Sequence, residues 1–105
     1  PIHRMARLVV RCKDEKTGND YADRLADAFR VTLENRQKAG EPADLRLLGP
    51  AEAPVFRLKG YFRYHFQMHS ASSGVLHQVL RAVLPSVRVP TGVEVTVDID
   101  PQDML

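Results

Sequence analysis

Residues 56–69 read FRLKGYFRYHFQMH, a stretch in which two kinds of side chain alternate. Even positions carry mostly large apolar side chains, and such alternation is typical of a strand with one buried face. Gly60 indicates a hairpin tip or a kink rather than the middle of a strand. The face opposite the apolar one would carry Arg57, Lys59, Tyr61, Arg63, His65, Gln67 and His69.

Three other segments are predicted to be strands. Residues 6–13 alternate between apolar and mostly basic positions, and residues 93–100 between apolar and mostly acidic ones. Residues 44–48 are expected to form a short strand that Gly49-Pro50 ends.

Two further segments repeat apolar residues at helical spacing. The first, residues 20–38, is expected to follow a turn at residues 14–19 and to be capped by Thr17 or Asn19. The second is expected to begin at Ser72 or Ser73 and to stop at Pro85.

The predicted element order is therefore β-α-β-β-α-β. Its compact solution is an α+β two-layer sandwich of the ferredoxin-like kind, with a four-stranded antiparallel sheet and both helices on one face. A chain of 105 residues is expected to form a single domain, residues 1–105. With the first strand between the third and the last, the uncovered face would carry Arg7, Arg11, Lys13, Arg63, His65, Gln67, Glu94, Thr96 and Asp98.

Charge is unevenly spread along the chain, although the net charge is only +2. Residues 53–93 contain five basic residues and no acidic one, which indicates an anionic partner. Cations on the exposed strand face could meet phosphates, and Tyr61 could stack on a base. An ordinary polar strand face is the alternative interpretation. The candidate site residues are Arg57, Lys59, Tyr61, Arg63 and His65.

No catalytic or metal-binding constellation is evident. The chain has no phosphate-binding glycine loop, nucleophile elbow or zinc-protease motif. Asp98 and Asp100 share a face but offer too few ligands, and His65 and His69 would lie roughly 13 Å apart along a strand. Cys12, the one cysteine, falls on an apolar face and is expected in the core. With no apolar run of about 18 residues, no membrane partner is expected.

Residues 48–65, LGPAEAPVFRLKGYFRYH, and residues 97–105, VDIDPQDML, resemble two motifs of one protein family. It is the family of C-terminal domains of bacterial primosomal protein N′, the replication-restart helicase PriA. The resemblance implies a fold like that of ribosomal protein S10, in agreement with the element order above.

The resemblance also implies a role. The family's domain packs against the helicase core, binds branched or single-stranded DNA and helps to dock the acidic tail of the single-strand-binding protein. It implies a cytoplasmic, nucleoid-associated fragment without catalytic residues, whose ATP, magnesium and zinc sites belong to upstream domains. The DNA-binding role carries over to Arg57, Lys59, Tyr61, Arg63 and His65, although Arg57 or Arg63 could equally hold an interdomain contact.

The chain departs from the family pattern at three places. His69 stands where the family often has Lys, and Ala71-Ser72-Ser73 stands for Pro-Ser-Arg. Glu52 replaces the second proline of the Gly-Pro-x-Pro motif. All three changes reduce positive charge, so weak DNA binding by the isolated domain is expected.

Two alternatives from other classes remain. One is a free-standing S10-like domain that binds RNA or the ribosome, against which residues 100–105 argue because they match the helicase terminus. The other is an enzymatic or regulatory ferredoxin-like domain that binds a small molecule. The acids at Asp14-Glu15 oppose an anion-binding loop there, and no glycine-rich dimer loop is evident.

Overall fold

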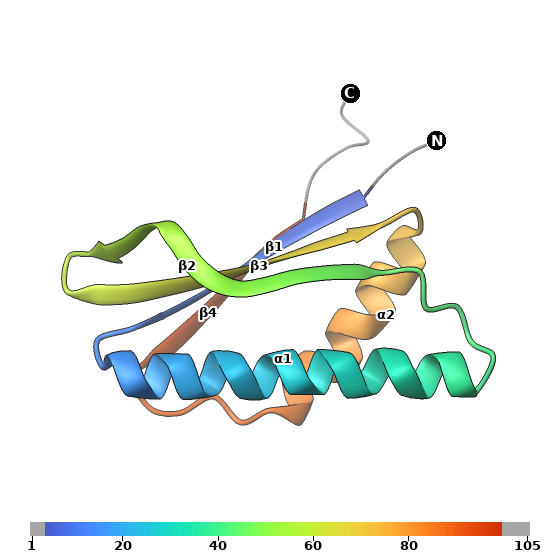
Figure 1. Cartoon of the computed structure of the whole chain (residues 1–105), viewed down its shortest axis with the longest axis horizontal. Coiled ribbons are helices and arrows are strands. Elements are labelled where there is room, and N and C mark those ends of the chain that lie inside the picture. The colour runs from blue at the N-terminus through green and yellow to red at the C-terminus, as the bar shows by residue number, and fades with distance from the viewer. Residues whose placement is uncertain (1–3, 100–105) are drawn as a thin grey trace.

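The computed structural model describes residues 4–99 and shows a four-stranded sheet with two α-helices (Figure 1). The strand order is β2-β3-β1-β4, and each neighbouring pair is antiparallel. The predicted order β-α-β-β-α-β is confirmed. The elements are β1 (Arg4–Cys12), α1 (Glu15–Lys38), β2 (Arg46–Leu58), β3 (Tyr61–Ser70), α2 (Ser73–Val83), the short 3-10 helix η1 (Leu84–Ser86) and β4 (Val93–Ile99).

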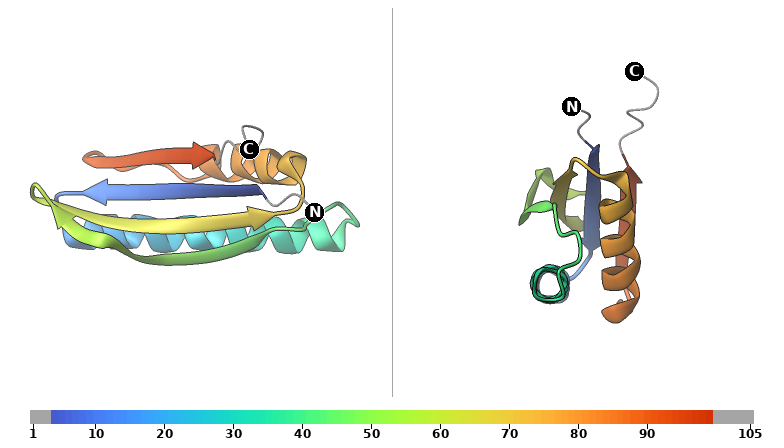
Figure 2. Two further views of the ribbon diagram at one scale, coloured as in Figure 1. Left: turned by 90° about the horizontal axis from the view of Figure 1, so that it is seen from above. Right: turned by 90° about the vertical axis from the view of Figure 1, so that its right-hand side faces the viewer.

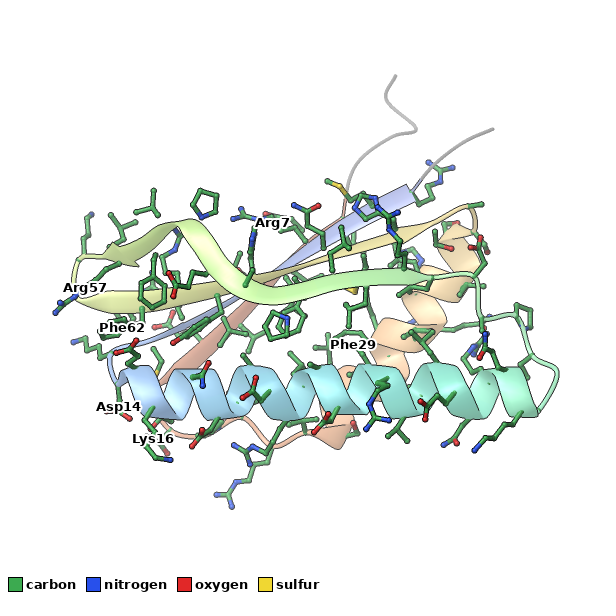
Figure 3. The ribbon with its side chains drawn as sticks, viewed as in Figure 1. Arg7, Asp14, Lys16, Phe29, Arg57 and Phe62 are labelled. Carbon is green, nitrogen blue, oxygen red and sulfur yellow. The ribbon has the colours of Figure 1, made fainter. Side chains whose placement is uncertain are left out.

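Both helices lie behind one face of the sheet, and the other face has no helix over it (Figure 2). The core fills the space between the layers. Figure 3 shows Phe29 pointing from α1 toward the sheet, and its ring centroid lies 6.1 Å from that of Phe66. Leu8 and Val10 of β1 and Leu76 of α2 are fully buried in the same cluster. The apolar faces predicted for the first and third strands are therefore those that meet the helices.

Helix α1 starts earlier than predicted. It begins at Glu15 because Asp14 is its N-cap, with the carboxylate accepting a hydrogen bond from the Thr17 backbone N–H at 2.9 Å. A hydrogen bond from the Thr17 hydroxyl, and after it this backbone bond, hold the pKa of Asp14 below its usual value. The predicted turn and the caps at Thr17 or Asn19 were thus wrong. The cap predicted for the second helix is confirmed, since Ser72 Oγ accepts from the Val75 N–H at 3.2 Å.

Strand β2 runs past the Gly49-Pro50 pair that was predicted to end it. The pairing with β3 shifts twice, between Leu48 and Ala51 and again between Glu52 and Arg57. The Gly49-Pro50 peptide bond is cis, and Gly49 has φ 105°. A Cβ atom at Gly49 would lie 2.6 Å from the His65 carbonyl oxygen, so only glycine fits. The chain absorbs the two turn-forming residues as a bulge rather than a stop.

The hairpin tip predicted at Gly60 is confirmed. Lys59 and Gly60 form a two-residue turn with φ values of 53° and 81°, as a type I′ turn requires. Across this turn Arg57 pairs with Phe62 and Leu58 with Tyr61, so odd-numbered residues face even-numbered ones. The prediction that odd positions share one face from 57 to 69 was therefore wrong for Arg57. Arg57 pairs with Phe62, whose side chain lies on the face of the sheet that the helices cover.

Two further observations concern the apolarity of the helices and the extent of the last strand. Within residues 4–99, neither helix is both long and apolar enough to cross a membrane. The predicted last strand is confirmed as far as Ile99, and Asp100 lies outside the described residues.

Candidate nucleic-acid interface

The uncovered sheet face, called the open face below, is centred on β1 and β3. Their register pairs Arg11 with Arg63 and Val9 with His65. On the other side of β1, Arg11 pairs with Glu94 of β4 and Arg7 with Asp98. The face is thus positive over the two central strands and acidic along the β4 edge. Its described strand residues on β1, β3 and β4 are Met5, Arg7, Val9, Arg11, Tyr61, Arg63, His65, Gln67, His69, Glu94, Thr96 and Asp98.

Arg11 and Tyr61 form the most connected part of this face. The Arg11 guanidinium carbon lies 4.0 Å from the centroid of the Tyr61 ring, and Lys13 Nζ lies 5.4 Å from it. Arg11 also pairs with the Glu94 carboxylate at 3.3 Å. Because the Arg11 and Glu94 side chains are 38% and 53% exposed, this ion pair orients the guanidinium more than it stabilises the fold.

His65 lies between two arginines near the middle of the sheet. Arg7 Nε donates to His65 Nδ1 at 3.4 Å, which requires the unprotonated nitrogen. Partial burial, followed by the positive charges of Arg7 and Arg63, lowers the pKa of His65 below 6.5. His65 is therefore neutral at physiological pH and adds an acceptor, not a charge, to the free domain.

Arg63 is fixed by the irregular part of β2. Its Nη1 donates to the Val55 carbonyl oxygen at 2.9 Å. That carbonyl lies in the bulge, where residues 53–56 of β2 lie opposite residue 63 alone. The same bulge turns Phe56 inward, and its ring centroid lies 5.4 Å from those of Phe62 and Tyr64.

The five residues predicted from the sequence do not share one surface. Tyr61, Arg63 and His65 lie on the open face. Lys59 forms the turn. The Arg57 guanidinium carbon lies 5.0 Å from the Phe62 ring centroid, on the helix side of the hairpin (Figure 3). Cations therefore surround the hairpin tip instead of lining one side of it.

The sequence interpretation left Arg7, Arg11 and Lys13 out of its candidate site. The register places Arg11 opposite Arg63, Arg7 lies opposite Gln67 and contacts His65, and Lys13 follows directly at the end of β1. Figure 3 shows Arg7 on the side of the sheet away from the helices. The sequence contained the information needed to include these three residues, because the predicted strand order already placed the first strand next to the third.

Three other features of the described residues bear on function: possible metal ligands, Cys12 and a surface groove. Among residues 4–99, no three His, Cys, Asp or Glu side chains lie together as a metal site would require. Cys12 is 3% exposed and belongs to the core, as predicted. A groove of about 420 Å³ lies between α2, η1 and β4. It is lined by His77, Leu80, Arg81, Leu84, Pro85, Val97 and Ile99.

The two-layer arrangement places the chain among the ferredoxin-like folds, here with a cationic sheet face. A de novo designed protein, Foldit4, aligns with a TM-score of 0.66 at 10% identity, over 94% of this chain and 97% of that one. The de novo designed LFR1 1, with a ferredoxin fold, aligns with a TM-score of 0.52 at 10% identity, over 94% and 85% of the two chains. At such identities these matches establish the fold alone.

Sequence comparison is more specific than the fold. The model of the family described as primosomal protein N C-terminal domain matches residues 1–102, and the chain belongs to this family. A replication restart protein PriA from Treponema pallidum is 33% identical over 105 residues, which is all of this chain and 15% of the relative. Another from Rickettsia typhi is 32% identical over 60 residues, or 57% of this chain and 9% of the relative. The chain thus spans a small part of the relatives' length.

Proposed function

We propose that this chain is the DNA-binding and docking domain of a replication-restart helicase, and that its open face contacts DNA phosphates. The observation that carries the proposal is the set of cations on the two central strands of an uncovered sheet face. Arg7, Arg11 and Arg63 each have a protein group that fixes their orientation. Side chains that are already ordered lose less conformational entropy when a phosphate binds.

The acidic residues of β4 limit where DNA can lie on the open face. Glu94 and Asp98 would repel a phosphate backbone, so the DNA lies over β1, β3 and the hairpin tip. At the tip, Arg57 and Lys59 extend the positive region past the end of the sheet. Backbone contacts of this kind carry no sequence information, so binding is expected to be non-specific.

A salt titration tests the proposal. Fluorescence anisotropy of labelled DNA would be measured with the wild type, Arg63→Ala on the open face and Arg81→Ala, an exposed arginine on α2, as the matched control. If Arg7, Arg11, Lys13 and Arg63 each meet one phosphate, log K should fall with log[salt] with a slope of about −3 to −4. Arg63→Ala should weaken binding and reduce that slope by about 1.

The same experiment can overturn the proposal. Absence of salt-sensitive binding in buffers of low ionic strength would contradict it. So would an equal loss in Arg63→Ala and Arg81→Ala, because net charge rather than the open face would then determine affinity. Thermal unfolding of each variant checks that the fold is intact.

The groove between α2 and β4 supports the docking part of the proposal. We assign it to the other domains of the same, longer protein, because the chain covers only 15% of the Treponema pallidum relative. Its lining is largely apolar, and Ile99 is 44% exposed. An apolar groove on the layer away from the cationic face lets one domain bind the helicase core and DNA together.

Hydrogen exchange tests the docking. Amides of α2 and β4 should exchange more slowly in the full-length protein than in this chain alone, and Ile99→Asp should remove that protection. Val89→Asp is the matched control, since Val89 is similarly exposed (46%) and is not among the residues that line the groove. Equal exchange rates in the two proteins would contradict the assignment.

Three further expectations remain predictions from the family resemblance. They are docking of the single-strand-binding protein's acidic tail, a cytoplasmic location near the nucleoid, and ATP-dependent helicase activity with zinc and magnesium sites in upstream domains. The RNA-binding alternative predicts equal or tighter binding to RNA duplexes in the same anisotropy experiment. A small-molecule domain predicts no salt-sensitive nucleic-acid binding.

A further inference from the structure

Tyr61 is the side chain that the sequence nominates for base stacking, but its ring already has partners. Arg11 and Lys13 lie 4.0 Å and 5.4 Å from its centroid. Arg11 is held over the ring by its ion pair with Glu94. A base that stacked on the ring face under Arg11 would displace a cation–π contact that the fold itself supports.

The rest of the open face offers little in place of Tyr61. Single-strand-binding sheets stack successive bases on several exposed aromatic rings. Among the open-face strand residues defined above, Tyr61 is the one Phe, Tyr or Trp. His65 is half-buried and accepts a hydrogen bond from Arg7, and His69 Nε2 contacts Gln67 Oε1 at 3.3 Å. The face therefore lacks a row of free stacking platforms.

The cations, in contrast, form a fixed array. Arg11 and Arg63 are register partners on adjacent strands, and Arg7 lies four residues from Arg11 along β1, roughly 13 Å away. A duplex presents phosphates at fixed positions and at about one charge per 1.7 Å of helix axis, which is denser than a single strand. A face that binds through fixed charges therefore gains more binding free energy from a duplex than from a single strand.

We propose that the open face binds the phosphate backbone of double-stranded DNA, such as the duplex arm of a fork, and not the bases of a single strand. This inference rests on the proposed function and narrows it. It assigns to Tyr61 the role of a positioning residue that holds Arg11 toward the phosphates.

Competition between DNA forms provides the test. A duplex, a single strand and an abasic single strand of equal length would be titrated against the wild type and Tyr61→Leu. We expect the duplex to bind several-fold tighter than either strand, and the normal and abasic strands to bind alike. Loss of stacking on one base weakens single-strand binding about five- to 150-fold. Because no base stacks on Tyr61 in this proposal, Tyr61→Leu should change the affinity for the single strand by no more than about twofold.

The outcomes separate this inference from the proposed function. If no DNA form binds in a salt-sensitive way, the proposed function itself fails. If DNA binds but the normal single strand is preferred over both duplex and abasic strand, the function stands and the duplex inference is wrong. The comparison of normal and abasic strands uses the wild type, so it decides the matter even if Tyr61→Leu does not fold.

Discussion

At the scale of single residues, the side of the sheet on which a side chain lies depends on turn geometry as well as on the alternation of the sequence. Arg57 and Arg63 are both odd-numbered, yet Arg57 pairs with Phe62 on the helix side whereas Arg63 pairs with Arg11 on the open face. The two-residue turn at Lys59 and Gly60 causes the change. Sequence alternation predicted the residues of the first, third and last strands well, but it could not be continued through the turn.

His65 gives a pH prediction at this scale. Its pKa is lowered from 6.5 in the folded state, so between that lower value and 6.5 the unfolded chain binds more protons. Stability should therefore be fully present above pH 6.5 and fall as the pH drops below it. Urea denaturation at several pH values should show a smaller acid loss for His65→Gln than for the wild type.

Other titrating groups affect the stability of the wild type and of His65→Gln alike, so the difference between the two proteins reports on His65. Carboxylates such as Asp14 also lose native hydrogen bonds in acid, but at lower pH and equally in both proteins. Parallel curves for the wild type and His65→Gln between pH 5.5 and 7.5 would contradict the role given to His65.

At the scale of secondary-structure elements, the sequence predicted which segments are strands and helices but misplaced two boundaries. Helix α1 starts at Glu15 because the Asp14 cap outcompetes the turn expected at residues 14–19. Strand β2 continues beyond Gly49-Pro50 because its pairing with β3 accommodates two register shifts. The first error is local, because Asp14 caps the helix through a residue only three positions away. The second comes from contacts between segments, since a local turn signal says nothing about the partner strand.

Gly49 gives a prediction at the scale of β2. A residue held at φ 105° costs about 1–3 kcal/mol when it is not glycine, and a Cβ 2.6 Å from the His65 carbonyl adds to that cost. Gly49→Ala should thus lower the free energy of unfolding in urea by at least this amount.

Gly40→Ala is the matched control for this change. Gly40 also has positive φ, at 72°, but nothing lies within 4 Å of a Cβ there. The difference between the two variants measures the close approach of β2 and β3 apart from backbone strain. Equal losses would show that the bulge relaxes without cost.

At the scale of the whole molecule, the two candidate binding surfaces lie on opposite layers. The open face presents cations from β1 and β3, and the helix side presents an apolar groove between α2 and β4. The strand order could be predicted from the sequence, and it already implied that the basic strands are neighbours. The groove could not, because it depends on how α2 and η1 lie against an edge strand.

The most direct test of the central claim is a chemical-shift map of this chain titrated with duplex DNA at low salt. The account predicts that backbone and side-chain signals of Arg7, Arg11, Lys13, Arg63 and His65 shift together, and that those of α2 and the β4 edge stay in place. Shifts confined to the α2–β4 groove, or no shifts at all, would contradict it.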